Sequence, residues 1–330
     1  MKRSGLLITT VLAAFMFMTS QTMKAQEQGE VRLPDYVEPD ETYVFAERDT
    51  SLYMDIYYPA DGSETAVNGV NKPTILYVFG GGFKGGRRDS RGTQRWFKLL
   101  ADEGFTIVAV DYRLGLKDAK KMGVAQASLL YNAIQIAVED VFSATKYIID
   151  HAEELDIDPS GIVVSGSSAG AITALQADYE LCNRSELASE LPEDFHYAGV
   201  MAFSGAVYTK KWGVRYRNEP APTLMFHGTA DRIVTYKQIR VLNQAFEGTS
   251  KLAKVFKNND YNYNIYRFDG NSHEIAAAML DTFPEQLRWL ETNVMRKEKR
   301  TVDAHVSDPS IMKFEIGNLK DLYGGNVNLE

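Results

Sequence analysis

The chain alternates between short apolar runs and longer stretches in which apolar residues recur at helical spacing. Continuous apolar runs of this kind are typical of parallel strands that are buried on both faces of a sheet. The runs that we interpret as strands are Thr74–Phe79, Phe105–Val110, Ile162–Val164, Gly199–Phe203 and Thr223–Phe226, and Tyr263–Phe268 is also strand-like although it is not a continuous apolar run. They predict the parallel centre of one sheet.

The segments upstream of these runs predict an antiparallel edge. Tyr43–Ala46 and Leu52–Tyr58 are strand-like, and Asp49-Thr50 lies near the turn between them. A long helix is predicted between about Ser128 and Ala152, where we expect Asp140 to be structural. Its apolar residues at helical spacing are Ala137, Val141, Ala144 and Ile148. The fold class that follows is α/β, with a mostly parallel central sheet, an antiparallel N-terminal edge and helices on both faces.

Length and composition agree with one large domain. The chain has 330 residues, of which 45% are hydrophobic and 24% charged, as in ordinary soluble globular proteins. Two small domains would also fit this length, but there is no repeat and no Gly/Ser- or Pro-rich linker between residues 42 and 295. We therefore expect a catalytic domain at 42–295, an N-terminal linker at 26–41 and a surface tail at 296–330.

The first residues predict export. Lys2 and Arg3 precede the apolar run Leu6–Met18, and cleavage is expected near Ala25, so that residues 1–25 form a signal peptide. A membrane anchor is the alternative, but a spanning helix needs about 20 apolar residues, more than this run contains. The single cysteine, Cys182, excludes an internal disulfide and a lipidated thiol near the cleavage site. A periplasmic or extracellular protein without a stable membrane anchor follows.

The charge of the chain excludes one class of partner. The formal net charge is −8, and removal of Lys2, Arg3 and Lys24 with the signal peptide subtracts three positive charges, which gives −11. Proteins that bind nucleic acid carry clustered positive charge, so nucleic acid is not expected as a partner. The sequence leaves the oligomeric state open.

The pentapeptide Gly166-Ser167-Ser168-Ala169-Gly170 contains the candidate nucleophile. It fits the G-x-S-x-G pattern, in which a tight turn between a strand and a helix exposes the central serine. The predicted strand Ile162–Val164 precedes it, and a helix is predicted from Ala169 through Ala177. Ser168 is therefore the expected nucleophile. A serine hydroxyl needs a histidine that takes its proton and a carboxylate that orients the histidine.

His273 and Asp231 are the expected partners of Ser168. His273 lies in a loop after the strand Tyr263–Phe268, and Asp231 lies just beyond the strand Thr223–Phe226, where ligands bind in open α/β sheets. The order serine, acid, histidine along the chain is that of α/β-hydrolases. For His227, which lies at the end of the strand before Asp231, we expect a structural hydrogen bond.

The glycine run Gly80-Gly81-Gly82 after the strand Thr74–Phe79 predicts an oxyanion hole. Without side chains, backbone N–H groups can approach the oxygen of a substrate on which negative charge develops. We assign this role to the N–H groups of Gly81, Gly82 and Ala169. The alternative is a glycine turn with no catalytic role. No cofactor and no metal is required by this chemistry.

These motifs, together with the segments 52–59 and Asp111-Tyr112-Arg113-Leu114, resemble the esterase branch of the α/β-hydrolase superfamily, over about residues 42–295. That branch includes hormone-sensitive-lipase-like enzymes and acetyl-xylan or feruloyl esterases. The resemblance implies an α/β-hydrolase fold and hydrolysis of carboxylic esters through an acyl-enzyme. The sequence departs from the pattern at Phe79, where the family usually has histidine, and at Gly115-Leu116, where many relatives have Ala-Pro.

Several functional alternatives stay open. The expected substrate is a small-molecule or polysaccharide-linked ester. Export and the short stretch between Ser204 and Thr223, which leaves little chain for a lid over the site, suit a carbohydrate-linked acetyl or feruloyl group. A peptidase or amidase would use the same triad. A non-catalytic binding protein on the same fold is the alternative from another class. Aromatic residues that either stack on sugar or pack in the interior are Tyr208, Trp212 and Tyr216. The cluster Arg87, Arg88 and Arg91 either meets an acidic substrate or forms a solvated loop.

Overall fold

A nine-stranded sheet crosses the part of the chain that the computed structural model describes, which is residues 37–117, 127–210, 213–241, 244–308 and 310–311. These residues fall within one compact unit. Its strands, in spatial order, are β1 (Glu41–Glu47), β2 (Ser51–Tyr57), β6 (Thr106–Val110), β5 (Thr74–Val78), β7 (Ile162–Ser167), β8 (Gly199–Phe203), β10 (Thr223–Gly228), β13 (Tyr263–Phe268) and β14 (Val302–Val306).

The strand directions confirm the predicted mixed sheet. β1 and β2 are antiparallel, and β2 is also antiparallel to β6. From β6 through β5, β7, β8, β10 and β13 to β14, every neighbouring pair is parallel. The residues of β5 and β8 are all buried, as expected for strands that helices cover on both faces.

The order of the strands reverses between β5 and β7. The chain passes from β5 to β6 on one side and then returns to β7 on the other side. In open α/β sheets, ligands bind at such a point, beyond the carboxyl ends of the two strands. The glycine run 80–82 follows β5 and Ser168 follows β7, so both motifs lie at this edge of the sheet.

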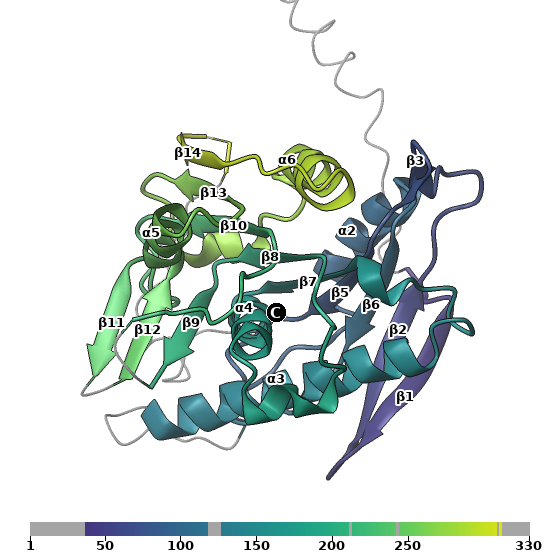
Figure 1. The fold of residues 1–330 in the computed structure, drawn as a ribbon, viewed down its shortest axis with the longest axis horizontal. Helices are drawn as coiled ribbons and strands as arrows, with labels where there is room; N and C mark the ends of the chain where they lie inside the picture. Colours follow the sequence, from purple (N-terminus) through teal and green to yellow (C-terminus); the bar gives the residue numbers. More distant parts are fainter. Residues whose placement is uncertain (1–36, 118–126, 211–212, 242–243, 309, 312–330) are drawn as a thin grey trace, which may run out of the picture. The chain divides into compact units, whose positions relative to one another are not determined.

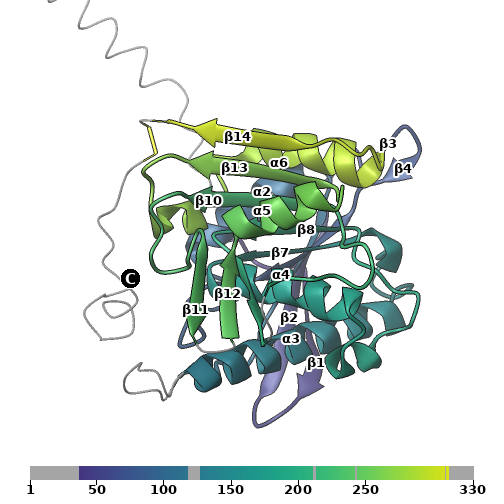
Figure 2. The same cartoon turned by 60° about the vertical axis from the view of Figure 1, so that its left-hand side comes forward.

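Helices cover both faces of the sheet (Figures 1 and 2). α3 (Ala127–Asp150) and α4 (Ala169–Cys182) lie on one face, and α2 (Arg91–Asp102) and α6 (Phe283–Trp289) lie on the other. The indole Nε1 of Trp96 in α2 donates a 2.7 Å hydrogen bond to Gln286 Oε1 in α6, and this bond joins the two helices. The short α5 (Thr249–Asn258) packs near β12 and β13.

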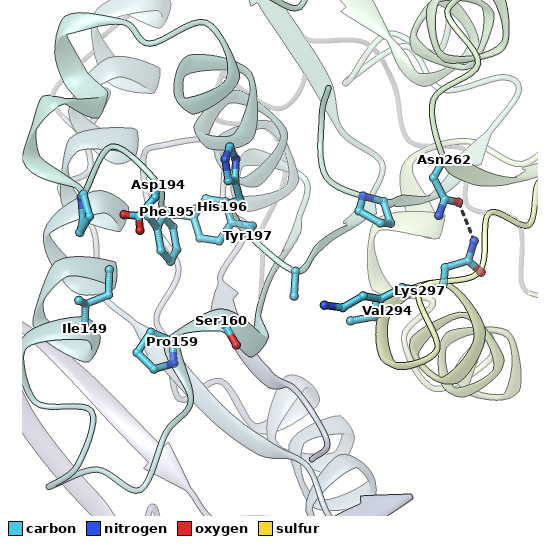
Figure 3. A pocket seen from close by; sticks show the side chains of 14 residues that line it. Ile149, Pro159, Ser160, Asp194, Phe195, His196, Tyr197, Asn262, Val294 and Lys297 are labelled. Atoms are coloured by element: carbon cyan, nitrogen blue, oxygen red, sulfur yellow. Dashed lines mark hydrogen bonds between the residues drawn. The ribbon is translucent and has the colours of Figure 1, made fainter. Parts of the chain in front are cut away.

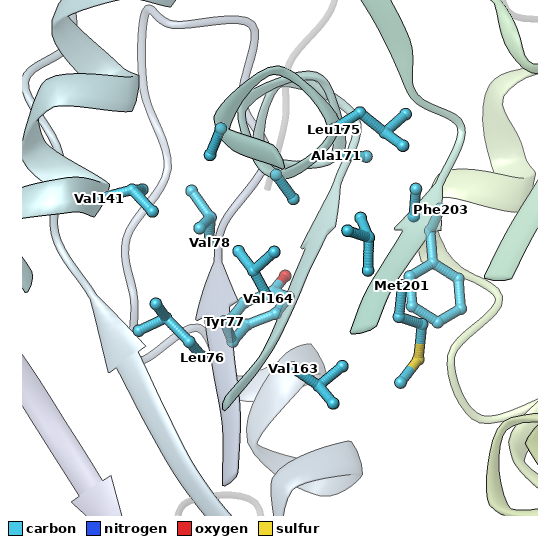
Figure 4. Close-up of a cluster of buried hydrophobic side chains, with 14 of the residues drawn as sticks. Leu76, Tyr77, Val78, Val141, Val163, Val164, Ala171, Leu175, Met201 and Phe203 are labelled. Carbon is cyan, nitrogen blue, oxygen red and sulfur yellow. The ribbon is translucent and has the colours of Figure 1, made fainter. Parts of the chain in front are cut away.

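The core between the sheet and the α3/α4 layer consists of aliphatic side chains (Figure 4). Leu76 and Val164 come from the sheet, Val141 from α3, and Ala171 and Leu175 from α4. Each of them is at most 2% exposed. Burial of one large aliphatic side chain contributes about 1.5–3 kcal/mol, so this layer holds α4, and with it the turn at Ser168, firmly on the sheet.

Asp140 in α3 forms a buried ion pair with Arg113. Its carboxylate accepts a 2.7 Å hydrogen bond from the backbone N–H of Arg113 and lies 2.8 Å from Arg113 Nη2. Burial raises the pKa of Asp140, although the hydrogen bonds and charge of Arg113 oppose this. The contact ties α3 to the loop after β6, as expected for a structural residue.

The predicted surface tail at 296–330 is wrong for residues 302–306. These residues form β14, which pairs in parallel with β13 from Asn264↔Val302 to Phe268↔Val306. The strand has no continuous apolar run and its burial alternates between exposed and intermediate, so the sequence carries little signal for it. β14 pairs there because the backbone N–H and C=O groups along the edge of β13 bond to it. Residues 312–330 lie outside the described residues.

Shorter elements complete the architecture. A small antiparallel sheet has the order β11-β12-β9, and β3 and β4 form a separate pair. The bounds are β3 (Ala66–Val67), β4 (Val70–Asn71), β9 (Ala206–Thr209), β11 (Gln238–Val241), β12 (Gln244–Gly248), the 3₁₀ turns Pro159–Gly161, Glu186–Glu190 and His273–Ala277, and the π-helical turn Leu290–Met295.

The predicted signal peptide at 1–25 lies outside the described residues, as does the linker up to residue 36. Among the helices in the described ranges, none combines the length and apolar character that a membrane crossing requires. The export prediction therefore stays a prediction.

Candidate active site

Ser168 lies at a sharp turn between β7 and α4. Its φ of 52° and ψ of −114° place a non-glycine residue in a sparsely populated region, which costs about 1–3 kcal/mol. The glycines on either side are required by close packing: a β-carbon at Gly166 would lie 2.3 Å from the carbonyl carbon of Gly170, and one at Gly170 would lie 2.0 Å from Val78 O. The neighbouring strand and helix thus hold the turn in its strained form.

The structure brings the three predicted residues together. Ser168 Oγ lies 2.8 Å from His273 Nε2, and His273 Nδ1 lies 2.8 Å from Asp231 Oδ2. Because the carboxylate can only accept a hydrogen bond, Nδ1 carries a proton and donates a hydrogen bond to Asp231. Nε2 is then the acceptor for the Ser168 hydroxyl, as a general base requires.

Asp231 is held as an anion by four donors. Its Oδ1 accepts from the backbone N–H groups of Ile233 and Val234 at 2.9 and 3.1 Å. Its Oδ2 accepts from His273 and lies 3.2 Å from His227 Nε2. Burial raises the pKa of Asp231, but the hydrogen bonds and charges of His227 and His273 outweigh it and hold the pKa well below its usual range.

His227 is fully buried and contacts the acid directly. Its Nε2 lies 3.0 Å from Val234 O as well as 3.2 Å from Asp231 Oδ2, and its Nδ1 lies 2.9 Å from Thr249 Oγ1. Nε2 therefore donates, and Nδ1 accepts from the Thr249 hydroxyl. The expected structural hydrogen bond is present, but the sequence analysis missed that its partner includes Asp231. The spacing of four residues between them was the available signal.

Glu274 and Ser167 fix the loop that carries His273, and the sequence analysis missed both. Glu274 Oε1 accepts from the Ser272 backbone N–H at 2.9 Å and from Asn271 Nδ2 at 3.0 Å. Ser167 Oγ, next to the nucleophile, donates a 2.6 Å hydrogen bond to Ala276 O. The bonds of Glu274 hold the residues before His273, and the bond of Ser167 connects the turn at Ser168 to the segment after His273.

The glycine loop after β5 lies against this turn. A β-carbon at Gly80 would lie 3.3 Å from Ser168 Cβ, and Gly81 and Gly82 have φ values of 119° and 64°. Phe79, which occupies the position of the usual family histidine, stacks on Tyr112 at 4.4 Å between ring centroids. The Tyr112 hydroxyl also donates a 3.0 Å hydrogen bond to Phe79 O, so Tyr112 supports the start of the glycine loop through both its ring and its hydroxyl.

Comparisons with known proteins bear on the fold. Residues 54–213 match the sequence model of the BD-FAE family, a range that includes the glycine loop and Ser168 but ends before Asp231 and His273. A native structure of a thermophilic esterase, Est2 of Thermogutta terrifontis, superimposes with a TM-score of 0.56 at 22% identity, over 79% of this chain and 93% of that one. The chain has the α/β-hydrolase fold. A second structure of that esterase, phosphonylated by cyclosarin, gives a TM-score of 0.53 at 24% identity, over 75% of this chain and 94% of that one.

Two relatives share part of their sequence with this chain. Esterase LipI of Mycobacterium tuberculosis is 32% identical over 120 residues, which are 36% of this chain and 31% of that protein. Ethyl acetate hydrolase of Pseudomonas putida is 32% identical over 115 residues, which are 35% of this chain and 31% of that protein. The aligned part thus spans about a third of the length of these curated relatives.

The predicted arginine cluster divides into separate contacts. Arg88 bridges Asp55 and Asp111 at 2.7 and 2.8 Å, so it joins the start of α2 to the edge of the sheet. Arg87 pairs with its neighbour Asp89. Arg91 lies exposed on α2. The cluster therefore does not form a single anion site.

The aromatic residues considered for sugar binding pack against protein in the two cases that the structure describes. Tyr208 is 3% exposed, and its ring lies 4.8 Å from that of Tyr131. Tyr216 packs edge-on against Tyr179 and Phe256. Trp212 lies outside the described residues. Ordinary packing thus accounts for Tyr208 and Tyr216.

Two cavities lie at opposite edges of the sheet. One of about 600 Å³ lies at the amino ends of the strands, lined by Ser160 before β7, by His196 and Tyr197 before β8 and by Asn262 before β13 (Figure 3). This edge of the sheet is opposite to the one that carries Ser168. The other cavity, of about 410 Å³, is lined by Gly80, Ser167 and Ala276 among others. It therefore lies beside the turn at Ser168. Over the described ranges, no group of three His, Cys, Asp or Glu side chains is arranged to hold a metal ion.

Proposed function

We propose that this chain is a serine hydrolase that cleaves carboxylic esters through an acyl-enzyme. The observation that carries the proposal is the continuous hydrogen-bonded series from Ser168 Oγ through His273 to Asp231, with both distances at 2.8 Å. This geometry is the one that a serine nucleophile requires, because the proton acceptor and the group that orients it are both in contact before substrate arrives.

In the acylation step, Ser168 Oγ attacks the ester carbonyl carbon while its proton passes to His273 Nε2. The imidazolium that forms is stabilised by Asp231, which stays ionised because its pKa lies below the usual range. The N–H groups of Gly81, Gly82 and Ala169 face the developing oxyanion in this proposal, and one such donor typically contributes about 2.7–4 kcal/mol. The imidazolium then protonates the leaving alcohol, and the acyl group stays on Ser168.

Deacylation repeats these steps with water. His273 Nε2 takes a proton from a water molecule, whose oxygen attacks the acyl carbon, and the imidazolium returns the proton to Ser168 Oγ as the carboxylic acid leaves. Support for an ester as the substrate comes from the relatives, of which one is named an esterase and one an ethyl acetate hydrolase.

Hydrolysis of 4-nitrophenyl acetate by the wild-type protein and by Ser168→Ala tests the proposal. We expect the activity to be lost in Ser168→Ala and kept in the matched control Ser189→Ala, whose exposed hydroxyl donates a hydrogen bond to Glu186 O. Equal activity in wild type and Ser168→Ala contradicts the proposal. Aminoacyl anilides assayed in parallel test the amidase alternative, and faster cleavage of the anilides would replace ester by amide as the substrate.

For the physiological substrate we propose an acetyl or feruloyl ester linked to carbohydrate, cleaved by an exported protein. The support is the predicted signal peptide at residues 1–25 together with the sequence resemblance. The packing of Tyr208 and Tyr216 lends it no support. We expect acetate or ferulate to be released from xylan fragments faster than small aryl esters are hydrolysed. A preference for the aryl esters contradicts the proposed substrate.

A further inference from the structure

The cavity of about 410 Å³ lies next to the catalytic turn, between three segments of the chain. Gly80 belongs to the glycine loop, Ser167 directly precedes Ser168, and Ala276 lies three residues after His273. A β-carbon at Gly80 would lie 3.3 Å from both Ser167 Oγ and Ser168 Cβ, so this end of the cavity is one residue removed from the reacting hydroxyl. Ser168 itself does not line the cavity, so a group that binds there is a substituent of the substrate and not its ester bond.

The two walls of this cavity differ in chemistry. The side formed by residues 276–280 contributes Ala277, Met279 and Leu280, which are apolar. The opposite side, at the start of α2, contributes two arginines and two hydroxyl groups: Arg87, Arg95, Ser90 and Thr93. Ser90 Oγ and Thr93 Oγ1 lie 2.8 Å apart, and Thr93 also bonds to Tyr77, so the arginines are the donors on this side that a ligand can use.

The charge of the cavity is opposite to that of the protein. The chain has 44 acidic and 36 basic residues, yet the residues that line the cavity include Arg87 and Arg95 and no Asp or Glu. Asp89 balances Arg87 through an ion pair. Arg95 is exposed and forms no ion pair with any residue in the described ranges, so its charge is available to a ligand.

From this juxtaposition we propose that the cavity binds a carboxylate carried by the ester substrate, with Arg95 as its main charged contact. The proposal rests on the proposed ester hydrolysis and specifies its substrate. A guanidinium recognises a carboxylate through charge-assisted hydrogen bonds, and the apolar wall of Met279 and Leu280 covers the hydrocarbon between the carboxylate and the ester. The carboxylate belongs either to the acyl half or to the alcohol half of the substrate.

Two pairs of substrates distinguish these halves. Mono-4-nitrophenyl succinate carries the carboxylate on the acyl side and is compared with 4-nitrophenyl acetate, which is neutral. 4-Acetoxybenzoate carries it on the alcohol side and is compared with its neutral methyl ester. We expect one anionic ester to be preferred over its neutral partner in kcat/KM, and Arg95→Gln to lower that preference about fivefold, the factor of a partly solvated ion pair. The effect lies in KM, since Arg95 does not contact the reacting atoms.

Arg91→Gln is the matched control. Arg91 lies on the same helix, is equally exposed and does not line the cavity. The proposal requires the two variants to differ. It is overturned if both variants keep the preference for the anionic ester. It is also overturned if both lower this preference equally, because an equal effect reflects the overall charge of the protein rather than the cavity. Lower activity of Arg95→Gln on the neutral esters alone also overturns it.

Binding to Ser168→Ala separates this proposal from the proposed function. Equilibrium dialysis of mono-4-nitrophenyl succinate and of 4-acetoxybenzoate against Ser168→Ala, with and without Arg95→Gln, requires no turnover. Binding of one probe that Arg95→Gln weakens supports the carboxylate site even if wild type hydrolyses no ester, in which case only the proposed function fails. Binding of neither probe, or binding that Arg95→Gln leaves unchanged, overturns the site while Ser168-dependent hydrolysis stands.

Discussion

Replacement of Asp231 by Asn tests the role of the acid with almost no change in shape. Asp231 Oδ1 accepts from the backbone N–H groups of Ile233 and Val234, so in Asp231→Asn the amide oxygen keeps this position. The amide nitrogen then replaces Oδ2 and points its hydrogens at His273 Nδ1 and His227 Nε2, which are both donors in the wild-type protein. His227 keeps Val234 O as an acceptor. His273 has no other acceptor at Nδ1 among its described contacts.

His273 therefore takes the other tautomer, with its proton on Nε2. A protonated Nε2 cannot accept the proton of Ser168, so the general base is lost while the fold is kept. In a triad of this kind the same change lowers kcat about 10⁴-fold, which corresponds to roughly 5 kcal/mol of activation free energy. The substrate contacts do not involve Asp231, so KM is expected to change little.

The assay is steady-state hydrolysis of 4-nitrophenyl acetate, with circular dichroism to show that the variant is folded. Asp269→Asn is the control, because Asp269 lies in the adjoining loop, is about half exposed and contacts His305 instead of the triad. We expect near wild-type kcat for this control. A loss of less than about tenfold in folded Asp231→Asn, or a similar loss in the control, would refute the assigned role.

Three further predictions concern stability and are measured by urea unfolding. Gly170→Ala places a β-carbon 2.0 Å from Val78 O and is expected to cost about 3 kcal/mol, whereas Gly85→Ala meets no atom within 4 Å and stays near wild type; equal stability of the two would contradict the packing argument. Burial raises the pKa of Asp178 from 3.8 to about 7, so the folded state binds this proton more tightly and stability falls as pH rises from about 4 to about 7. Asp178→Asn should remove this pH-dependent part of the unfolding free energy, which is roughly 4 kcal/mol at most. An unchanged pH dependence in the variant would contradict the raised pKa of Asp178. Asp140→Ala leaves the backbone N–H of Arg113 without its acceptor, whereas the guanidinium keeps Glu139 at 2.6 Å, and the substitution is expected to cost about 1–3 kcal/mol; a cost below about 0.5 kcal/mol would contradict a structural role.

The parallel strands were predicted because their burial on both faces gives continuous apolar runs. Gly199–Phe203 and Tyr263–Phe268 have the predicted bounds. The strand predicted at Ile162–Val164 continues to Ser167, since Ser165 and Gly166 pair with β5 although they are not apolar. Where backbone pairing or close packing decides the structure, hydropathy alone gives no signal.

The same limit explains which parts of the site were missed. Ser168, Asp231 and His273 were predictable from a local turn motif and from their order along the chain. Glu274 bonds to Ser272 and Asn271 in its own loop, and His227 contacts Asp231 four residues further on. These contacts are close in sequence, but they depend on the irregular backbone of the two loops, which the hydropathy pattern does not encode. β14 was missed for a related reason, because its place is determined by the edge of β13 and not by its own pattern.

Covalent labelling of Ser168 tests the central claim most directly. The folded wild-type protein is incubated with a fluorophosphonate, and the intact mass and the labelled peptide are then determined by mass spectrometry, beside Ser168→Ala and Asp231→Asn. We predict one adduct on Ser168 of the wild-type protein and no adduct on Ser168→Ala. Labelling of Asp231→Asn should be slower, because His273 has the wrong tautomer. Absence of an adduct on folded wild-type protein, or an adduct on a different serine, would contradict the central claim.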